Sequence, residues 1–374
     1  MKGGKSVPVI KFIKKNTVFC IAALAAAVTA FFVPPDKEYI GYFDMKTLAC
    51  LFLTLAVICA LRNIKFFTIV ARKIVLLTGN LRSLFVALIC ITFIGSMLIA
   101  NDMALITFLP LGYFALKTAR QEKYMAYLFI LQNISANLGG MLTPFGNPQN
   151  LYLYSYFNIP TGEFCLIMLP PFLLAITMLM LACIPVKAHK LTVSEGYTRK
   201  LNIPRTVLYL VLFAFSLLIV FRVIPYWLGL IVIPAVLLIA DRNSLLMVDY
   251  PLLGTFFFFF IFAGNLARID AVNSFMSTLL ERDTLLVSVL SCQGISNVPS
   301  AILLSRFTAD YRSLLLGVNI GGTGTLIASL ASLITFSQYR LHNPGKTKKY
   351  ILMFTLVNVI FLAVMTVAAK LFFV

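Results

Sequence analysis

Two polar islands inside long apolar runs carry the residues of this sequence that are best suited to bind an ion. The first is Asn101-Asp102 and the second is Ser296-Asn297. Placing a carboxylate near the middle of a membrane segment costs about 2.5–3.5 kcal/mol, so a functional role is its default explanation. Asp102 has the chemistry to coordinate a cation or to carry a coupling proton. Alternatively, Asn101 and Asp102 only cap the helix that follows, by accepting its free backbone N–H groups.

In the second island Asn297 occupies the equivalent place, with no acid beside it. Asn297 offers both a hydrogen-bond donor and an acceptor, so its amide can contact a cation or an oxyanion. Pro299 follows in the first turn of a predicted helix, where the missing N–H of proline costs nothing. The two islands are therefore predicted to be the matching tips of two helical hairpins.

Each island is followed by a cluster of helix-breaking residues. Segment 138–150 contains three glycines, two prolines and two asparagines, and segment 318–328 contains three glycines, one asparagine and two threonines. A continuous helix does not tolerate so many breakers. Unwinding in mid-membrane frees carbonyl groups for a cation and exposes a helix N-terminus to an anion. The alternative is that the glycines only allow close helix packing. The run Gly321–Thr325 lacks the lysine and the preceding strand of a phosphate-binding loop.

Composition places the chain in a membrane. Of its 374 residues, 60% are hydrophobic and 12% are charged, with a mean hydropathy of +0.95, whereas a soluble domain has about 25% charged residues. The net charge of +18 is spread over the loops rather than gathered in one stripe, which excludes a nucleic-acid partner. The seven cysteines and two histidines lack disulfide or metal-ligand spacing. No nucleophile–base set is present, so neither a cofactor nor enzymatic activity is expected.

Nine apolar segments have about the length of a spanning helix. They are 17–33, 46–61, 124–155, 164–184, 206–224, 227–240, 251–267, 313–337 and 350–373. With a cytoplasmic N-terminus, the inner loops hold 23 of the 31 Lys and Arg residues and the outer loops hold 8. This excess of inner positive charge favours that orientation, with the C-terminus outside. We expect an integral protein of a bacterial inner (plasma) membrane, in contact with lipid.

Two further apolar pieces, 82–117 and 284–305, are predicted to enter and leave on the same side of the membrane. The arms of the second are about 12 and 8 residues, or roughly 18 and 12 Å, too short to cross a core of about 30 Å. The arms of the first, at about fifteen residues or more, could nearly cross, so its depth stays open. Re-entrant backbone is tolerated only where protein or water covers it. The hairpin tips therefore predict a covered pocket.

The same order of elements occurs twice, in opposite directions across the membrane. The predicted units are an N-terminal repeat at 1–184 with a hairpin at 82–117 and a broken helix at 124–155, a cytoplasmic linker and extra spanning helix at 185–226, and a C-terminal repeat at 227–374 with a hairpin at 284–305 and a broken helix at 313–337. The predicted fold is an all-α polytopic membrane protein. It is an inverted-topology repeat with about nine spanning helices, two re-entrant helical hairpins and two broken helices, an arrangement typical of transporters.

Four motifs in order resemble the ion transporter superfamily. They are Asn101-Asp102-Met103-Ala104-Leu105, then Ala136-Asn137-Leu138-Gly139-Gly140 with Thr143-Pro144 and Gly146-Asn147, then Ser296-Asn297-Val298-Pro299, and Asn319 with Gly321-Gly322-Thr323-Gly324-Thr325. That group includes citrate-transporter-like permeases, divalent-anion/sodium symporters and arsenite/antimonite permeases. The resemblance covers about 80–370. It implies a transport domain of hairpins and broken helices that moves against a scaffold, usually in a homodimer.

The hairpin tips depart from one branch of that superfamily. Its carboxylate symporters look to carry Ser-Asn-Thr at both tips, whereas this chain has Ala100-Asn101-Asp102 and Ser296-Asn297-Val298. The Asn-Asp tip looks more like the arsenite-type branch. The candidate substrate- and ion-binding residues are Asn101, Asp102, Asn137, Gly140, Thr143, Pro144, Asn147, Ser296, Asn297, Pro299, Asn319, Gly322, Thr323 and Thr325. Among them, Asn101, Asp102 and Asn297 are the candidate ligands of a coupling Na⁺.

Together these features predict a secondary active transporter for a small anion or oxyanion, of the carboxylate or arsenite/antimonite type. Transport would be coupled to Na⁺ or H⁺ and would proceed by elevator-like alternating access. An alternative is a Na⁺/H⁺ antiporter on the same fold, with Asp102 as the exchanged site. A non-transporting membrane scaffold or enzyme is the remaining alternative, and an enzyme would need a catalytic set that the sequence lacks.

Overall fold

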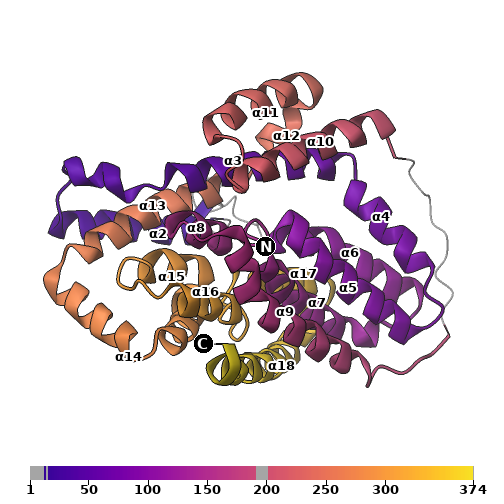
Figure 1. Cartoon of the computed structure of the whole chain (residues 1–374). Helices are drawn as coiled ribbons and strands as arrows, with labels where there is room; N and C mark the ends of the chain where they lie inside the picture. The colour runs from indigo at the N-terminus through magenta and orange to yellow at the C-terminus, as the bar shows by residue number, and fades with distance from the viewer. Residues whose placement is uncertain (1–11, 14–15, 191–200, 374) are drawn as a thin grey trace, which may run out of the picture.

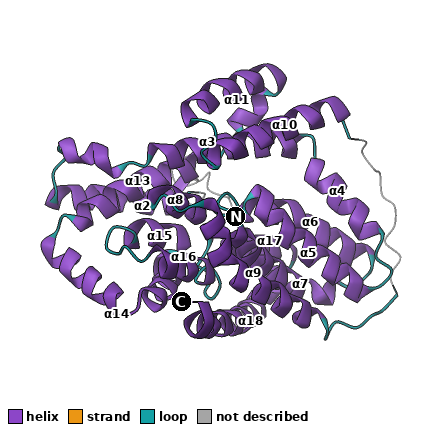
Figure 2. Cartoon of the chain, viewed as in Figure 1, coloured by secondary structure: helices purple, strands orange, loops and turns teal. Residues whose placement is uncertain are grey.

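The computed structural model describes residues 12–13, 16–190 and 201–373. Figure 2 shows that this part of the chain is helical, and an isolated antiparallel bridge joins Asn80 to Lys190. The α-helices are α2 (Thr17–Phe32), α3 (Met45–Asn63), α4 (Phe66–Leu76), α5 (Leu81–Ile99), α6 (Asn101–Thr118), α7 (Met125–Gly139), α8 (Pro148–Tyr156), α9 (Thr161–Cys183), α10 (Ile203–Val220), α11 (Tyr226–Ala240), α12 (Arg242–Leu246), α13 (Tyr250–Ala267), α14 (Asp270–Ile295), α15 (Asn297–Leu304), α16 (Tyr311–Ile320), α17 (Leu330–His342) and α18 (Thr347–Ala368). Short 3₁₀ turns are η1 (Lys37–Tyr42), η2 (Glu122–Tyr124), η3 (Gly140–Leu142) and η4 (Pro344–Lys346), and the π-helical η5 is Ala369–Phe373.

Several helices begin where the local sequence supplies a capping side chain. Asn80 and Ser83 form a capping box at the start of α5, in which each side chain accepts the other residue's backbone N–H. Asp44, Asp249 and Asp310 cap α3, α13 and α16 in the same way, by accepting an N–H from the first turn. These carboxylates stand at helix N-termini, where negative charge is favourable.

Six helical segments of the described chain are long and apolar enough to cross a membrane. They are 45–63, 81–99, 161–183, 203–220, 250–267 and 344–373. Five of them match predicted spans, and two further predicted spans are the shorter apolar helices α2 and α11. The remaining two predicted spans are interrupted, as expected from their glycines and prolines. α7 and η3 end before α8 begins at Pro148, and α16 ends at Ile320 before α17 begins at Leu330.

The two predicted hairpins differ in length. α14 contains 26 residues, but Asp283 is non-helical at φ −164° and ψ 86°, so only the part after it forms the inner arm. The return helix α15 has 8 residues, about 12 Å, so the second hairpin is as short as predicted. The first is longer, because α5 has 19 residues and α6 has 18, or about 28 and 27 Å.

The second parts of the two broken helices are exchanged between the halves of the chain. α8, which follows the first break, packs against α15 and α16 from the C-terminal half. α17, which follows the second break, packs against α6 and α7 from the N-terminal half. Figure 1 shows these elements within the body of the molecule, while α3, α10, α11 and α12 form a separate group along its upper side. The exchange brings both hairpin tips and both breaks into one region.

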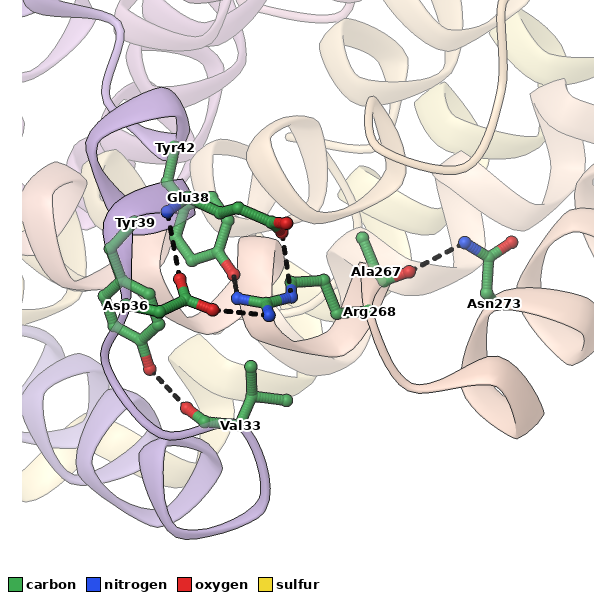
Figure 3. A network of polar contacts seen from close by, with 8 residues as sticks. All are labelled: Val33, Asp36, Glu38, Tyr39, Tyr42, Ala267, Arg268 and Asn273. Carbon is green, nitrogen blue, oxygen red and sulfur yellow. Dashed lines mark hydrogen bonds and ion pairs between the residues drawn. The ribbon is translucent and has the colours of Figure 1, made fainter.

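A charged contact fixes the N-terminal helix to the opposite half. α2 packs along α13, and the loop after α2 folds over the end of α13 (Figure 1). Arg268 reaches back to this loop, with Nη2 at 2.6 Å from Asp36 Oδ2 and Nε at 3.2 Å from Glu38 Oε2. Figure 3 shows the same guanidinium donating to the Tyr42 hydroxyl, at 3.1 Å. We call Arg268, Asp36 and Glu38 the α2–α13 clasp.

Candidate functional site

The two hairpin tips share an unusual backbone. Ala100 has φ 62° and ψ 150°, and Ser296 has φ 76° and ψ 157°. This region is populated almost only by glycine, and a residue with a side chain there costs on the order of 1–3 kcal/mol. Each strained residue directly precedes an asparagine that begins the return helix. The surrounding helices must hold both tips in this shape.

The tip asparagines make the same local contact. Oδ1 of Asn101 accepts the N–H of Asp102 at 2.9 Å, and Oδ1 of Asn297 accepts the N–H of Val298 at 3.0 Å. Their amide nitrogens remain available for other partners. Asn101 Nδ2 donates to Asn137 Oδ1 at 3.1 Å. Asn297 Nδ2 lies beside Gly322, at 3.0 Å from where a Cβ would be.

Buried asparagines connect the two broken helices. Asn137 donates to Ser329 Oγ at 3.1 Å, and Asn147 donates to Asn319 Oδ1 at 3.3 Å. Asn319 in turn donates to Asn150 Oδ1 at 2.6 Å. We call Asn101, Asn137, Asn147, Asn150, Asn297 and Asn319 the asparagine cluster, and each is at most 4% exposed. The cluster draws residues from both halves of the chain.

Two predicted glycines leave room for these amides. A Cβ on Gly140 would lie 2.4 Å from Asn147 Oδ1, and a Cβ on Gly322 would lie 3.0 Å from Asn297 Nδ2. Asn147 Oδ1 is buried and has no hydrogen-bond partner among the described residues. Such an orphaned acceptor calls for a water or a ligand.

Side chains satisfy the unwound backbone of each break. At the first, Asn150 donates to the carbonyls of Gly140 and Met141, both at 3.2 Å. At the second, Gln293 donates to the carbonyls of Gly321 at 2.9 Å and Thr323 at 3.1 Å, and its Oε1 accepts the N–H of Thr325 at 2.9 Å. Asn150, within the first break's own segment, therefore satisfies the carbonyls there, whereas Gln293 of the neighbouring hairpin does so at the second.

The other predicted residues mostly support this framework. The hydroxyl of Thr143 donates to Met97 O at 2.8 Å, that of Thr323 to Ile320 O at 2.7 Å, and that of Thr325 to Gln293 O at 3.2 Å. Ser296 Oγ makes longer contacts, at 3.4 Å to Asn297 Oδ1 and to Ala328 O. Pro144 lies in the first break, and Pro299 is buried in the first turn of α15.

Asp102 faces a different environment from its neighbour Asn101. It lines a cavity of about 30 Å³ together with Thr54 of α3 and Asp249 at the start of α13. Its Oδ1 is buried and has no hydrogen-bond partner in the described part of the chain. The predicted Na⁺ ligands Asn101, Asp102 and Asn297 are thus divided, with the two asparagines in the cluster and the acid in the cavity.

Comparison with known proteins identifies the family. The family described as citrate transporter (CitMHS) matches residues 9–312, most of the chain. The chain belongs to the citrate transporter family. Over 344 residues it is 34% identical to the uncharacterized transporter MJ0456 of Methanocaldococcus jannaschii, covering 90% of this chain and 92% of that protein.

Two further relatives are named as membrane or transport proteins. This transporter-family member is 28% identical over 341 residues to the inner membrane protein YbiR of Escherichia coli K12, covering 88% of this chain and 89% of that protein. It is 32% identical over 162 residues to the silicon efflux transporter LSI3 of Oryza sativa subsp. japonica, covering 42% of this chain and 33% of that protein. With its apolar helices, this membership makes the chain an integral membrane protein.

The sequence reasoning missed five residues that contribute to these sites. They are Thr54, Asn150, Asp249, Gln293 and Ser329. A signal for Ser329 was present, because it follows Asn319 by the same ten positions that separate Asn147 from Asn137. Thr54, Asp249 and Gln293 carry no such signal, since each acts on a segment far away in the sequence.

Proposed function

We propose that this protein is a secondary active transporter whose asparagine cluster binds a small anion or oxyanion. One observation carries the proposal. Four helices, α6, α8, α15 and α17, begin at the cluster, with Asn101, Asn147, Asn297 and Ser329 at their first or capping positions. Helix N-termini present partial positive charge and free N–H groups, and they favour an anion.

The same region also suits a coupling cation. Helices α5, α7, α14 and α16 end there, and the C-terminal carbonyls of helices carry partial negative charge. Substrate and a coupling ion, Na⁺ or H⁺, can therefore be bound close together, as in transporters built on broken helices. We infer that the cargo is of the carboxylate or arsenite/antimonite type, and the name of the rice relative, a silicon efflux transporter, adds a silicon compound to those worth testing.

We further propose that the chain is an inverted-topology repeat that works by elevator-like alternating access. Matching contacts support this proposal. A Cβ added to Gly139 would touch Ser96, and a Cβ added to Gly321 would touch Cys292. Each of these two residues stands five places before a tip asparagine. Thr143 and Thr325 donate to the carbonyls four places before those asparagines. In this scheme the N-terminus is cytoplasmic, the C-terminus is outside, and two copies form a homodimer in a bacterial inner membrane.

A Na⁺/H⁺ antiporter on the same fold is the second candidate. It is favoured by Asp102, whose buried Oδ1 lacks a hydrogen-bond partner in the described chain. An antiporter would exchange cations at Asp102 without any anion. The four convergent helix N-termini favour the anion transporter instead.

Uptake into proteoliposomes tests the proposed function. The panel is succinate, citrate, sulfate, arsenite and silicic acid, with imposed Na⁺ or pH gradients. Asn147→Ala removes a cluster amide, while Asn243→Ala removes an exposed amide on α12 as a matched control. We expect uptake of one compound by the wild type and the control, and a loss of tenfold or more in Asn147→Ala, on the order of 1.4 kcal/mol of binding. Cation exchange without movement of any anion would establish the antiporter instead.

A further inference from the structure

The cavity that Asp102 lines lies between a hairpin tip and two helices outside the hairpins. Its lining residues are Leu51, Thr54, Leu55 and Ile58 of α3, Ala100, Asp102 and Met103 at the first tip, Phe145 and Pro148 at the first break, and Asp249 and Leu252 at the start of α13. Most of these are apolar. The lining contains two carboxylates and no basic side chain.

The other two polar side chains of the cavity, Asp249 and Thr54, already make hydrogen bonds within their own segments. Asp249 accepts the N–H of Leu252 at 3.0 Å, and the N-terminus of α13 stabilises its negative charge. The hydroxyl of Thr54 lies 2.8 Å from Cys50 O and 3.2 Å from Leu51 O, so its proton is used within α3. Asp102 Oδ1 has no donor among the described residues. Asp102 is partly buried, and an ionised carboxylate with a buried oxygen that accepts no hydrogen bond is disfavoured.

Among the residues that the structure describes, no basic side chain lines the cavity with the two acids. Arg62 of α3 is not a lining residue, and its Nη1 lies 3.6 Å from Sδ of the lining residue Met103. Other charged or titratable groups that touch α6, namely Arg72 at the Phe114 ring and His342 and Lys117 at the Tyr113 ring, lie near its other end, about three turns from Asp102. Asp249 is the charged group that shares the cavity with Asp102.

We propose that this cavity is a proton-binding site, separate from the asparagine cluster. Asp102 takes one proton from water and becomes a neutral carboxyl, whose O–H can donate to Asp249, to Thr54 or to a water in the cavity. The volume of about 30 Å³ has room for about two waters and not for a polyatomic anion.

The site would link protonation to movement of the first hairpin. Asp102 belongs to the hairpin, whereas Thr54 and Asp249 belong to α3 and the start of α13. A neutral Asp102 lets the tip rest against these helices, and loss of the proton places two like charges together in apolar surroundings, which repel. This inference rests on the proposed transport function, because it assigns the coupling ion to that function.

The experiment compares wild type with Asp102→Asn, Asp249→Asn and the exposed-acid control Glu281→Gln. Infrared difference spectra between acidic and basic buffer report protonation of a buried carboxyl without any transport. We expect a protonated-carboxyl band in wild type and Glu281→Gln that is absent in Asp102→Asn. In Asp249→Asn the band should titrate at lower pH, because the repulsion that favours the neutral form is gone. An unchanged band in Asp102→Asn overturns the proposal.

Transport assays separate the two claims. Exchange of a panel compound across proteoliposomes, with and without a pH or Na⁺ gradient, is measured for each variant. We expect a pH gradient to accelerate uptake by wild type and Glu281→Gln, with at least a tenfold loss of that stimulation in Asp102→Asn. Stimulation by Na⁺ alone overturns the proton site and leaves the transporter proposal intact. Absence of any anion exchange overturns the transporter proposal, while the infrared band still decides the site. Asp249→Asn keeps the test decisive if Asp102→Asn does not fold.

Discussion

Asn147 donates a hydrogen bond of 3.3 Å to Asn319, and this contact joins residues 172 positions apart in the chain. Asn147 occupies the N-cap position of the helix that follows the first break, and Asn319 lies in the last turn of the helix that precedes the second. A companion hydrogen bond runs from Asn137, in the last turn of the helix before the first break, to Ser329, the N-cap residue of the helix after the second break. The two breaks therefore stabilise each other, and changes at one should be felt at the other.

Gly140→Ala should lower both stability and transport. Its Cβ would stand 2.4 Å from Asn147 Oδ1 and 2.8 Å from Gly146 O, so the first break would have to shift. Overpacking of this kind costs about 1–3 kcal/mol. The control is Gly345→Ala, where a Cβ would meet nothing within 4 Å. Thermal unfolding in detergent should separate the two variants, and equal midpoints would show that the break tolerates the added methyl group.

Gln293→Ala should loosen the second break specifically. The substitution leaves the carbonyls of Gly321 and Thr323 and the N–H of Thr325 without their side-chain partner. Each unsatisfied group costs about 1–3 kcal/mol when buried. Gln293→Glu keeps an acceptor for Thr325 but turns a carboxylate oxygen towards the two carbonyls, so it should disrupt the break at least as much as Gln293→Ala. Hydrogen exchange of segment 321–329 is the measurement, and protection equal to wild type in both variants would contradict the role.

The hairpin tips should gain stability when their strained residues become glycine. Ala100→Gly relieves a backbone at φ 62° and ψ 150° that costs on the order of 1–3 kcal/mol. The added chain entropy of glycine opposes this by roughly 0.5–1 kcal/mol, so a net gain of up to about 2 kcal/mol is expected. Ala104→Gly, inside α6, should instead destabilise. A fall in the unfolding midpoint for Ala100→Gly would mean that the tip is unstrained.

The α2–α13 clasp should make stability depend on pH in the acid range. The hydrogen bond from Arg268 is the largest cause that holds the pKa of Asp36 below its usual value. A carboxyl with a lowered folded-state pKa stabilises the fold fully above its unfolded pKa of about 3.9 and progressively less as the pH falls towards the folded value. Asp36→Asn should therefore be less stable than wild type at neutral pH.

The difference between Asp36→Asn and wild type should shrink as the pH is lowered below about 4. Unfolding midpoints over a pH series measure it, with Glu281→Gln as an exposed-acid control. A constant difference across the series would show that Asp36 acts through packing and not through its charge. Figure 3 shows why charge is the expected cause, since the carboxylate of Asp36 and the guanidinium of Arg268 face each other directly.

The sequence alone determined those features of this protein that depend on neighbouring residues. Several glycines, or glycines and prolines together, within a few turns strongly disfavour a helix, so both breaks could be predicted. The polar islands marked the tips, and the spacing between Arg282 and Arg306 limited the second hairpin to short arms. Apolar length and loop charge indicated a membrane protein without any knowledge of packing.

Only the tertiary structure decided which way each polar side chain faces and what it meets. Consecutive residues of a helix point about 100° apart, so Asn101 joins the asparagine cluster while Asp102 enters the cavity with Asp249. The sequence could not place them apart, because the rotation of α6 is set by its packing against α5, α7 and α17. The pairing of Asn147 with Asn319 likewise depends on α8 and α17 being exchanged between halves, a long-range arrangement that local sequence does not encode.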